Sequence, residues 1–154
     1  MARQHGVLCF SLDRGNPLLW SHYADKHRGL ALGFDVDEGI SRPIIYRSTR
    51  PALGTKADQI ANALLFTKYE DWRYEQEIRI YTNLNERDPA SNLYFGDFGE
   101  QLVLREVIAG PLCPVTEKQL SDAVGSTTGV RLTKARLAFN TFRVVTDQRG
   151  FRTE

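Results

Sequence analysis

The hydrophobic positions of this chain follow two different periods, which divide it into short expected strands and helices. Brief apolar runs, or apolar residues alternating with polar ones, predict strands at residues 6–12, 30–35, 43–46, 101–109, 130–137 and 139–146. Helical spacing, or a capping residue at the start, predicts helices at residues 17–28, 58–69 and 116–124. This mixed order favours an α+β fold, with a mainly antiparallel mixed sheet and about three helices.

The expected helix boundaries rest on residues that commonly begin or end helices. Asn16 followed by Pro17 is typical of a helix start, and Thr116 is an N-cap residue before the last expected helix. Gly29 is expected to end the first helix as a C-cap.

Length and composition narrow the class of protein. The 154 residues are enough for one domain with one core, and 42% hydrophobic and 25% charged residues are ordinary values for a globular chain. A net charge of +1 provides no general attraction to nucleic acid or to an anionic membrane. No apolar run reaches the ~20 residues of a membrane span, and the N-terminus has no signal-peptide pattern. We therefore expect a single domain over residues 1–154, no membrane partner and a cytoplasmic location.

The two cysteines, Cys9 and Cys113, do not have metal-ligand spacing, and the N-terminus shows no secretion-signal pattern. Isolated cysteines of this kind are typical of reduced thiols in a cytoplasmic protein. No His, Cys or Asp cluster has the spacing of a metal site, so no metal is expected.

The densest chemistry lies in residues 72–79 (WRYEQEIR), which hold two carboxylates, two guanidiniums and two large aromatic rings. Buried charges are costly unless they are paired, so this segment is either a structural ion-pair network or a site. In a helix, Glu75 and Arg79 would be i,i+4 partners. In a strand, Glu75, Glu77 and Arg79 would share one face, and the following apolar alternation favours a turn that enters a strand.

A second cluster, residues 20–24 (WSHYA), falls within the first expected helix. Helical geometry places Trp20 and Tyr23 on one stripe and His22 on roughly the opposite side. One interpretation is an aromatic core stripe with a solvated histidine. The other makes His22 and Tyr23 polar groups of a site, because histidine changes charge near neutral pH.

Several of these segments together resemble the bacterial and phage domain-of-unknown-function family 2971. The motifs are Cys-Phe-Ser at 9–11, Leu-Trp-Ser-His-Tyr-Ala at 19–24, Arg-Gly-Leu-Ala-Leu-Gly-Phe-Asp at 28–35, Thr-Lys at 67–68, Trp-x-Tyr-Glu-x-Glu-x-Arg at 72–79 and Glu-Val-Ile-x-Gly at 106–110. They cover residues 7 to 110, and the last helix and two strands, 116–146, follow them. The family is largely uncharacterised, and some similar proteins are associated with abortive infection against phage, so the resemblance implies a link to phage defence.

The family usually has an upstream segment with an Asn-Asp-Pro motif, whereas this chain begins almost directly before the Cys-Phe-Ser strand. We therefore expect a fragment, a truncated gene product or a compact variant.

Two functions follow as hypotheses. In the first, both clusters form a site for a nucleotide or a nucleic acid. Its candidate catalytic residues are His22, Tyr23, Glu75 and Glu77. Its candidate substrate-binding residues are Trp20, Ser21, Lys68, Trp72 and Arg79. Because Glu75-x-Glu77 is similar to the Glu-x-Glu element of ADP-ribosyltransferases, one form of this hypothesis is ADP-ribosyl transfer with NAD as the substrate.

In the second hypothesis the chain is a non-catalytic binding or scaffold module, and the charged cluster is a structural ion-pair network. Its partner would be a small molecule, a nucleotide or another protein. The sequence names no cofactor, and it leaves the choice between the two hypotheses open.

Overall fold

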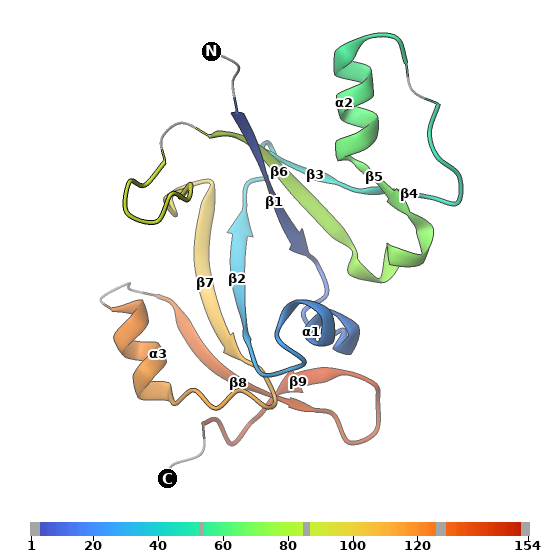
Figure 1. Cartoon of the computed structure of the whole chain (residues 1–154). Coiled ribbons are helices and arrows are strands. Elements are labelled where there is room, and N and C mark those ends of the chain that lie inside the picture. Colours follow the sequence, from blue (N-terminus) through green and yellow to red (C-terminus); the bar gives the residue numbers. More distant parts are fainter. Residues whose placement is uncertain (1–3, 53, 85–86, 126–128, 152–154) are drawn as a thin grey trace. The chain divides into compact units, whose positions relative to one another are not determined.

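The α+β class predicted from the sequence is confirmed by a computed structural model (Figure 1). The structure describes residues 4–52, 54–84, 87–125 and 129–151, and these contain nine strands and four helices, one of them a 3-10 helix. The chain divides into two compact units. The first unit is Met1–Leu12 with Val36–Phe98, and the second is Asp13–Asp35 with Gly99–Glu154. The expected single domain over residues 1–154 stays a prediction.

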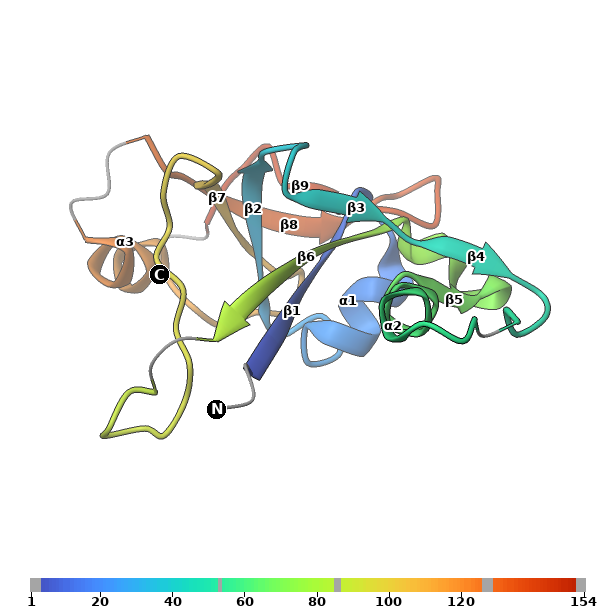
Figure 2. The same cartoon turned by 90° about the horizontal axis from the view of Figure 1, so that it is seen from above.

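The first unit contains one antiparallel sheet, one parallel strand pair and two helices. The sheet has the strand order β1-β6-β3, and β4 pairs with β5 in parallel. The strands are β1 (Gln4–Ser11), β3 (Ser41–Pro43), β4 (Ile45–Arg47), β5 (Thr67–Tyr69) and β6 (Glu77–Leu84), and the helices are α2 (Ala57–Leu65) and the 3-10 helix η1 (Glu70–Glu75). Figure 2 shows α2 beside β4 and β5.

The register of the antiparallel sheet brings several polar side chains to one face. Cys9 in β1 and Arg42 in β3 both lie opposite Arg79 in the central strand β6, and Ser11 lies opposite Glu77. Since side chains directly opposite one another point to the same side of a sheet, these residues share one face.

The second unit has a four-stranded sheet in the order β2-β7-β8-β9. Its elements are α1 (Pro17–Tyr23), β2 (Leu30–Val36), β7 (Leu102–Ala109), α3 (Glu117–Val124), β8 (Arg131–Leu137) and β9 (Val144–Thr146). Strand β8 is parallel to β7 and antiparallel to β9, so the sheet is mixed. Two groups of buried residues form its core, one around Trp20 and Ile108, the other around Val107 and Leu120.

The first predicted helix, 17–28, is wrong in its length. Helix α1 does begin at Pro17, with Asn16 as the cap, but it ends at Tyr23. Asp25, Lys26 and His27 follow with φ values of 43°, 52° and 72°, so the backbone leaves the right-handed helix well before Gly29. Backbone bonds hold this reversal, among them the His27 N–H to the Trp20 carbonyl at 3.0 Å.

Three other predicted boundaries are also wrong. The helix expected at 58–69 ends at Leu65, and its last part is strand β5, because residues 67–69 pair with β4. The strand expected at 43–46 is divided at Ile44, whose N–H donates to the Glu77 carbonyl at 2.9 Å. The strand expected at 139–146 is reduced to β9, and the apolar Phe139 and Phe142 are 84% and 96% exposed instead.

The remaining predictions agree more closely with the structure. Strands β1, β2, β7 and β8 lie at the expected positions, and α3 begins after Thr116 with a complete capping box to Gln119. No helix among the described residues is both long enough and apolar enough to cross a membrane.

Candidate functional site

The charged segment enters strand β6 through a turn, as the sequence predicts. The 3-10 helix η1 ends at Glu75, and β6 begins at Glu77. Between them Gln76 has a left-handed backbone, with φ 45° and ψ 51°, and its N–H donates to the Arg73 carbonyl at 3.2 Å. This turn lets two carboxylates from two different elements face the same neighbour.

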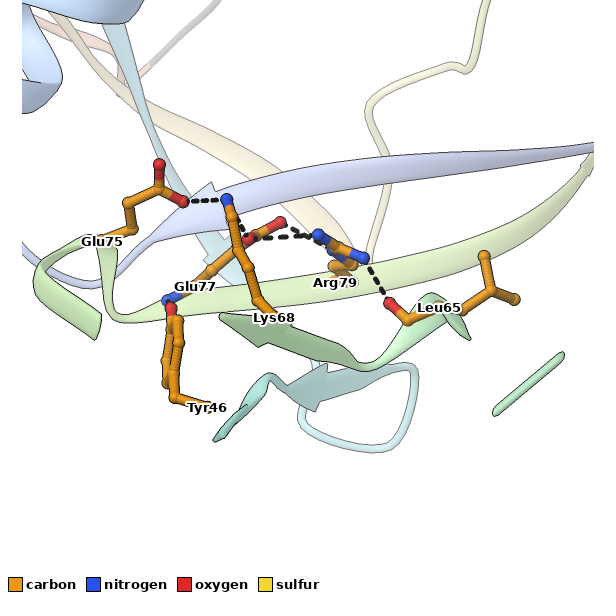
Figure 3. A network of polar contacts seen from close by, with 6 residues as sticks. All are labelled: Tyr46, Leu65, Lys68, Glu75, Glu77 and Arg79. Carbon is orange, nitrogen blue, oxygen red and sulfur yellow. Dashed lines mark hydrogen bonds and ion pairs between the residues drawn. The ribbon is translucent and has the colours of Figure 1, made fainter. Parts of the chain in front are cut away.

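That neighbour is Lys68 on β5, and Figure 3 shows its ammonium group between the two carboxylates. Lys68 Nζ forms an ion pair with Glu75 and another with Glu77, the latter at 3.1 Å. Arg79 binds Glu77 from the other side, with Nε at 2.6 Å from Oε1 and Nη2 at 3.2 Å from Oε2. We call Lys68, Glu75, Glu77 and Arg79 the charged cluster.

The charged cluster also binds the surrounding backbone. Arg79 donates to the carbonyl of Leu65, the last residue of α2. The free carbonyl groups and the helix dipole both stabilise a cation at this end of a helix. The Glu77 N–H donates to the Tyr46 hydroxyl at 2.8 Å (Figure 3). The charged cluster therefore ties together α2, β4, β5, η1 and β6.

Both carboxylates are buried, and the two cations are only partly exposed. Glu75 is 4% and Glu77 is 6% exposed, while the side chains of Lys68 and Arg79 are 22% and 17% exposed. Two negative and two positive charges are thus enclosed together. Such a group is tolerated in a protein interior because each ion has a charged partner and hydrogen bonds.

The pKa values reflect this pairing. Burial alone would raise the pKa of Glu77, but hydrogen bonds from Arg79, Cys9 and Lys68 outweigh burial and lower it from 4.5 to about 2. Burial opposes the charge of Lys68 as well, yet its bonds to Glu75 and Glu77 raise its pKa. The pKa of the Cys9 thiol is raised, first by burial and then by the adjacent Glu77 carboxylate. These directions keep Lys68, Glu77 and Arg79 ionised at neutral pH.

Aromatic rings lie beside the charged cluster. Lys68 Nζ is 5.0 Å from the centre of the Trp72 ring, and the Trp72 and Tyr74 rings are 6.0 Å apart. A cation over an aromatic face is stabilised by the ring electrons. Trp72 is therefore a further neighbour of Lys68, although 38% of it is exposed.

The structure thus brings together four of the predicted site residues from β5, η1 and β6, with Trp72 next to them. The helix assumed for Lys68 is absent, since this residue belongs to β5. Of the two geometries considered for Glu75, the strand does not hold, since Glu75 is the last residue of η1.

The second predicted cluster lies in the other unit. Trp20 is 3% exposed, packs in the core and donates from Nε1 to the Arg14 carbonyl at 2.7 Å. Ser21, His22 and Tyr23 are exposed, and the rings of His22 and Tyr23 are 6.2 Å apart. The convergence of His22 with Glu75 and Glu77 stays a prediction.

Sequence reasoning missed three partners of the charged cluster. These are the Tyr46 hydroxyl, the Leu65 carbonyl and the Cys9 thiol. Tyr46 belongs to a short apolar run, and a backbone carbonyl has no signal in a sequence. Cys9 is in a recognised motif, but only the strand register places it opposite Arg79.

No metal centre is visible in the described ranges, where no three His, Cys, Asp or Glu side chains are grouped closely enough to hold an ion. Comparisons of the chain with protein-family models, with curated proteins and with solved structures found no match.

Proposed function

We propose that this chain is a non-catalytic binding module and that its charged cluster is a structural ion-pair network. The observation that supports this most is the burial of Glu75 and Glu77, each only a few per cent exposed and each paired with Lys68. A carboxylate that acts on a substrate must present an oxygen to it, within about 3 Å. The carboxylates of Glu75 and Glu77 instead form ion pairs with cations of the protein itself.

The bonding of Glu77 supports this proposal. Its Oε1 accepts from Arg79 Nε, and its Oε2 accepts from both Lys68 Nζ and Arg79 Nη2. With a pKa of about 2, it is also a very weak base at neutral pH. To contact a ligand, Glu77 would have to leave Arg79 without its carboxylate partner and Lys68 with one of its two, which is costly.

A second candidate, ADP-ribosyl transfer, is favoured by one observation. Glu77 begins β6 directly after the turn, so Glu75-x-Glu77 leads into a strand, as the Glu-x-Glu element of ADP-ribosyltransferases does. In such a mechanism a carboxylate orients the nicotinamide ribose and stabilises the positive charge that develops at the anomeric carbon.

One experiment distinguishes the binding module from the ADP-ribosyltransferase. The purified chain is incubated with labelled NAD and candidate protein targets, beside Glu77→Gln and the control Glu70→Gln, which changes an exposed glutamate of η1. If the chain is a binding module, none of the three proteins should transfer ADP-ribose or hydrolyse NAD. Transfer by the parent chain and by Glu70→Gln, but not by Glu77→Gln, would overturn the proposal in favour of the transferase.

The resemblance to family 2971 supports a role of this module in bacteria or phages, and phage defence is the form of that role that we propose. The test is a plaque assay on bacteria that express the chain. A reduced plaque number, lost in a variant with the charged cluster disrupted (Lys68→Met), would support it. Equal plaque numbers with and without the chain, across a panel of phages, would count against it.

A further inference from the structure

A cleft of about 600 Å³ lies beside the charged cluster, within the first unit. The chain after β4, helix α2 and strand β5 form its walls, and these elements lie next to one another in Figures 1 and 2. Among the residues that line it are Arg47, Arg50, Pro51, Leu64, Lys68 and Tyr69. Its volume is in the range of small-molecule sites.

The charge of the cleft is positive. Arg47, Arg50 and Lys68 line it, and none of the described lining residues is acidic. The charge of Lys68 is already balanced by Glu75 and Glu77. Arg47 and Arg50 are exposed, and neither has an ion pair with a carboxylate in the part of the chain that the structure describes. Two guanidiniums are therefore available to bind an anion.

The rest of the lining suits an organic molecule better than a small inorganic ion. Pro51 and Leu64 provide apolar surface, Tyr69 provides an aromatic ring, and Thr67 provides a hydroxyl. Arginine binds phosphate through paired, charge-assisted hydrogen bonds, and flat aromatic groups of ligands stack on rings. The cleft thus combines a phosphate-binding side with an apolar side.

We propose that this cleft binds a phosphorylated small molecule with a flat apolar part, such as a nucleoside diphosphate. The inference rests on the proposed function, since it names the ligand class of the binding module. Arg47 and Arg50 hold the phosphates, and the surface of Pro51, Leu64 and Tyr69 contacts the base. Lys68 joins the cleft to the charged cluster, which keeps β5 in place.

The test is calorimetric titration of the full chain with ADP, adenosine and pyrophosphate in low salt. We expect ADP to bind at least ~10-fold more tightly than either of the others, because only ADP uses both sides of the cleft. Arg47→Gln and Arg50→Gln should each weaken ADP binding by about 10-fold or more, since each removes a charged donor. The matched control is Arg87→Gln, which changes an exposed arginine outside the cleft and should alter ADP binding less than ~2-fold.

Several results would overturn the assignment. One is that ADP binding is undetectable at millimolar concentration. Another is that adenosine or pyrophosphate binds as tightly as ADP. A third is that Arg87→Gln weakens ADP binding as much as Arg47→Gln and Arg50→Gln do. Thermal unfolding checks that each arginine variant is folded. Failure of the proposed function would look different: ADP would bind as expected, but transfer from labelled NAD would depend on Glu77.

Discussion

Replacing Glu77 by glutamine tests whether the charged cluster is structural. The pKa of this carboxyl falls from 4.5 to about 2 on folding, a fall of about 2.5. Each unit of pKa corresponds to ~1.4 kcal/mol, so the ionised carboxylate contributes roughly 3 kcal/mol to stability at neutral pH. Because Glu77 is only 6% exposed, little of this is lost to solvent screening. We expect Glu77→Gln to lower the free energy of unfolding by about that amount at pH 7.

The pH dependence has a definite sign. A carboxyl whose pKa is lower in the folded state stabilises it fully above the unfolded pKa, and this stabilisation is lost as the pH falls toward the folded pKa. For Glu77 the loss therefore runs from about pH 4.5 down to about pH 2. The difference between the parent chain and Glu77→Gln should shrink from roughly 3 kcal/mol at pH 7 to about half of that at pH 3.

Urea unfolding, followed by tryptophan fluorescence at several pH values, measures this difference. The matched control is Glu70→Gln, the same chemical change at an exposed position of η1, which should cost less than ~0.5 kcal/mol at every pH. A cost for Glu77→Gln below ~1 kcal/mol at pH 7, or one that does not change with pH, would refute the structural role. Glu77 would then lie in a wet cleft, as an enzyme requires.

Three further predictions follow from the same contacts. Lys68→Met leaves two buried carboxylates without their shared cation and should lower the free energy of unfolding by ~3 kcal/mol in the same urea assay, and a fully stable variant would contradict the pairing. The raised pKa of Cys9 should make its alkylation by iodoacetamide at pH 8 slower than that of a free peptide thiol, and Glu77→Gln should make the alkylation faster. Mass spectrometry of the Cys9 peptide measures both rates, and an unchanged rate in the variant would exclude Glu77 as a cause of the raised pKa. Thr116→Ala removes the capping box of α3 and should cost about 1 kcal/mol by thermal unfolding, whereas a variant as stable as the parent would show that this cap contributes nothing.

Local sequence patterns determined much of the fold. Alternating or continuous apolar runs located β1, β2, β7 and β8, because the period of a strand depends only on neighbouring residues. Capping residues likewise located the starts of α1 and α3, since a cap is made within one turn of the helix. The turn into β6 was also predictable, because Ile78 and Ile80 mark the strand that follows the charged segment.

Other features depended on contacts between residues far apart in the chain. Residues 67–69 follow a helical pattern, yet they form β5, because pairing with β4 and the ion pairs of Lys68 outweigh local propensity. The segment after α1 is also held by long-range backbone bonds that no local pattern contains, from the Gly110 N–H to the Gly29 carbonyl and from the Leu112 N–H to the His27 carbonyl, both at 3.0 Å.

The sequence by itself determined that two carboxylates and two cations are concentrated near the start of one strand. It left open whether they form a site or a structural network, because that depends on burial and on the partners of each charge. The tertiary structure decided the burial and the partners. It buries Glu75 and Glu77, brings Lys68 from β5 to both of them, and turns Arg79 toward Glu77 and the end of α2. A charge in a protein interior is stable only beside its partner, and three-dimensional packing supplies that partner.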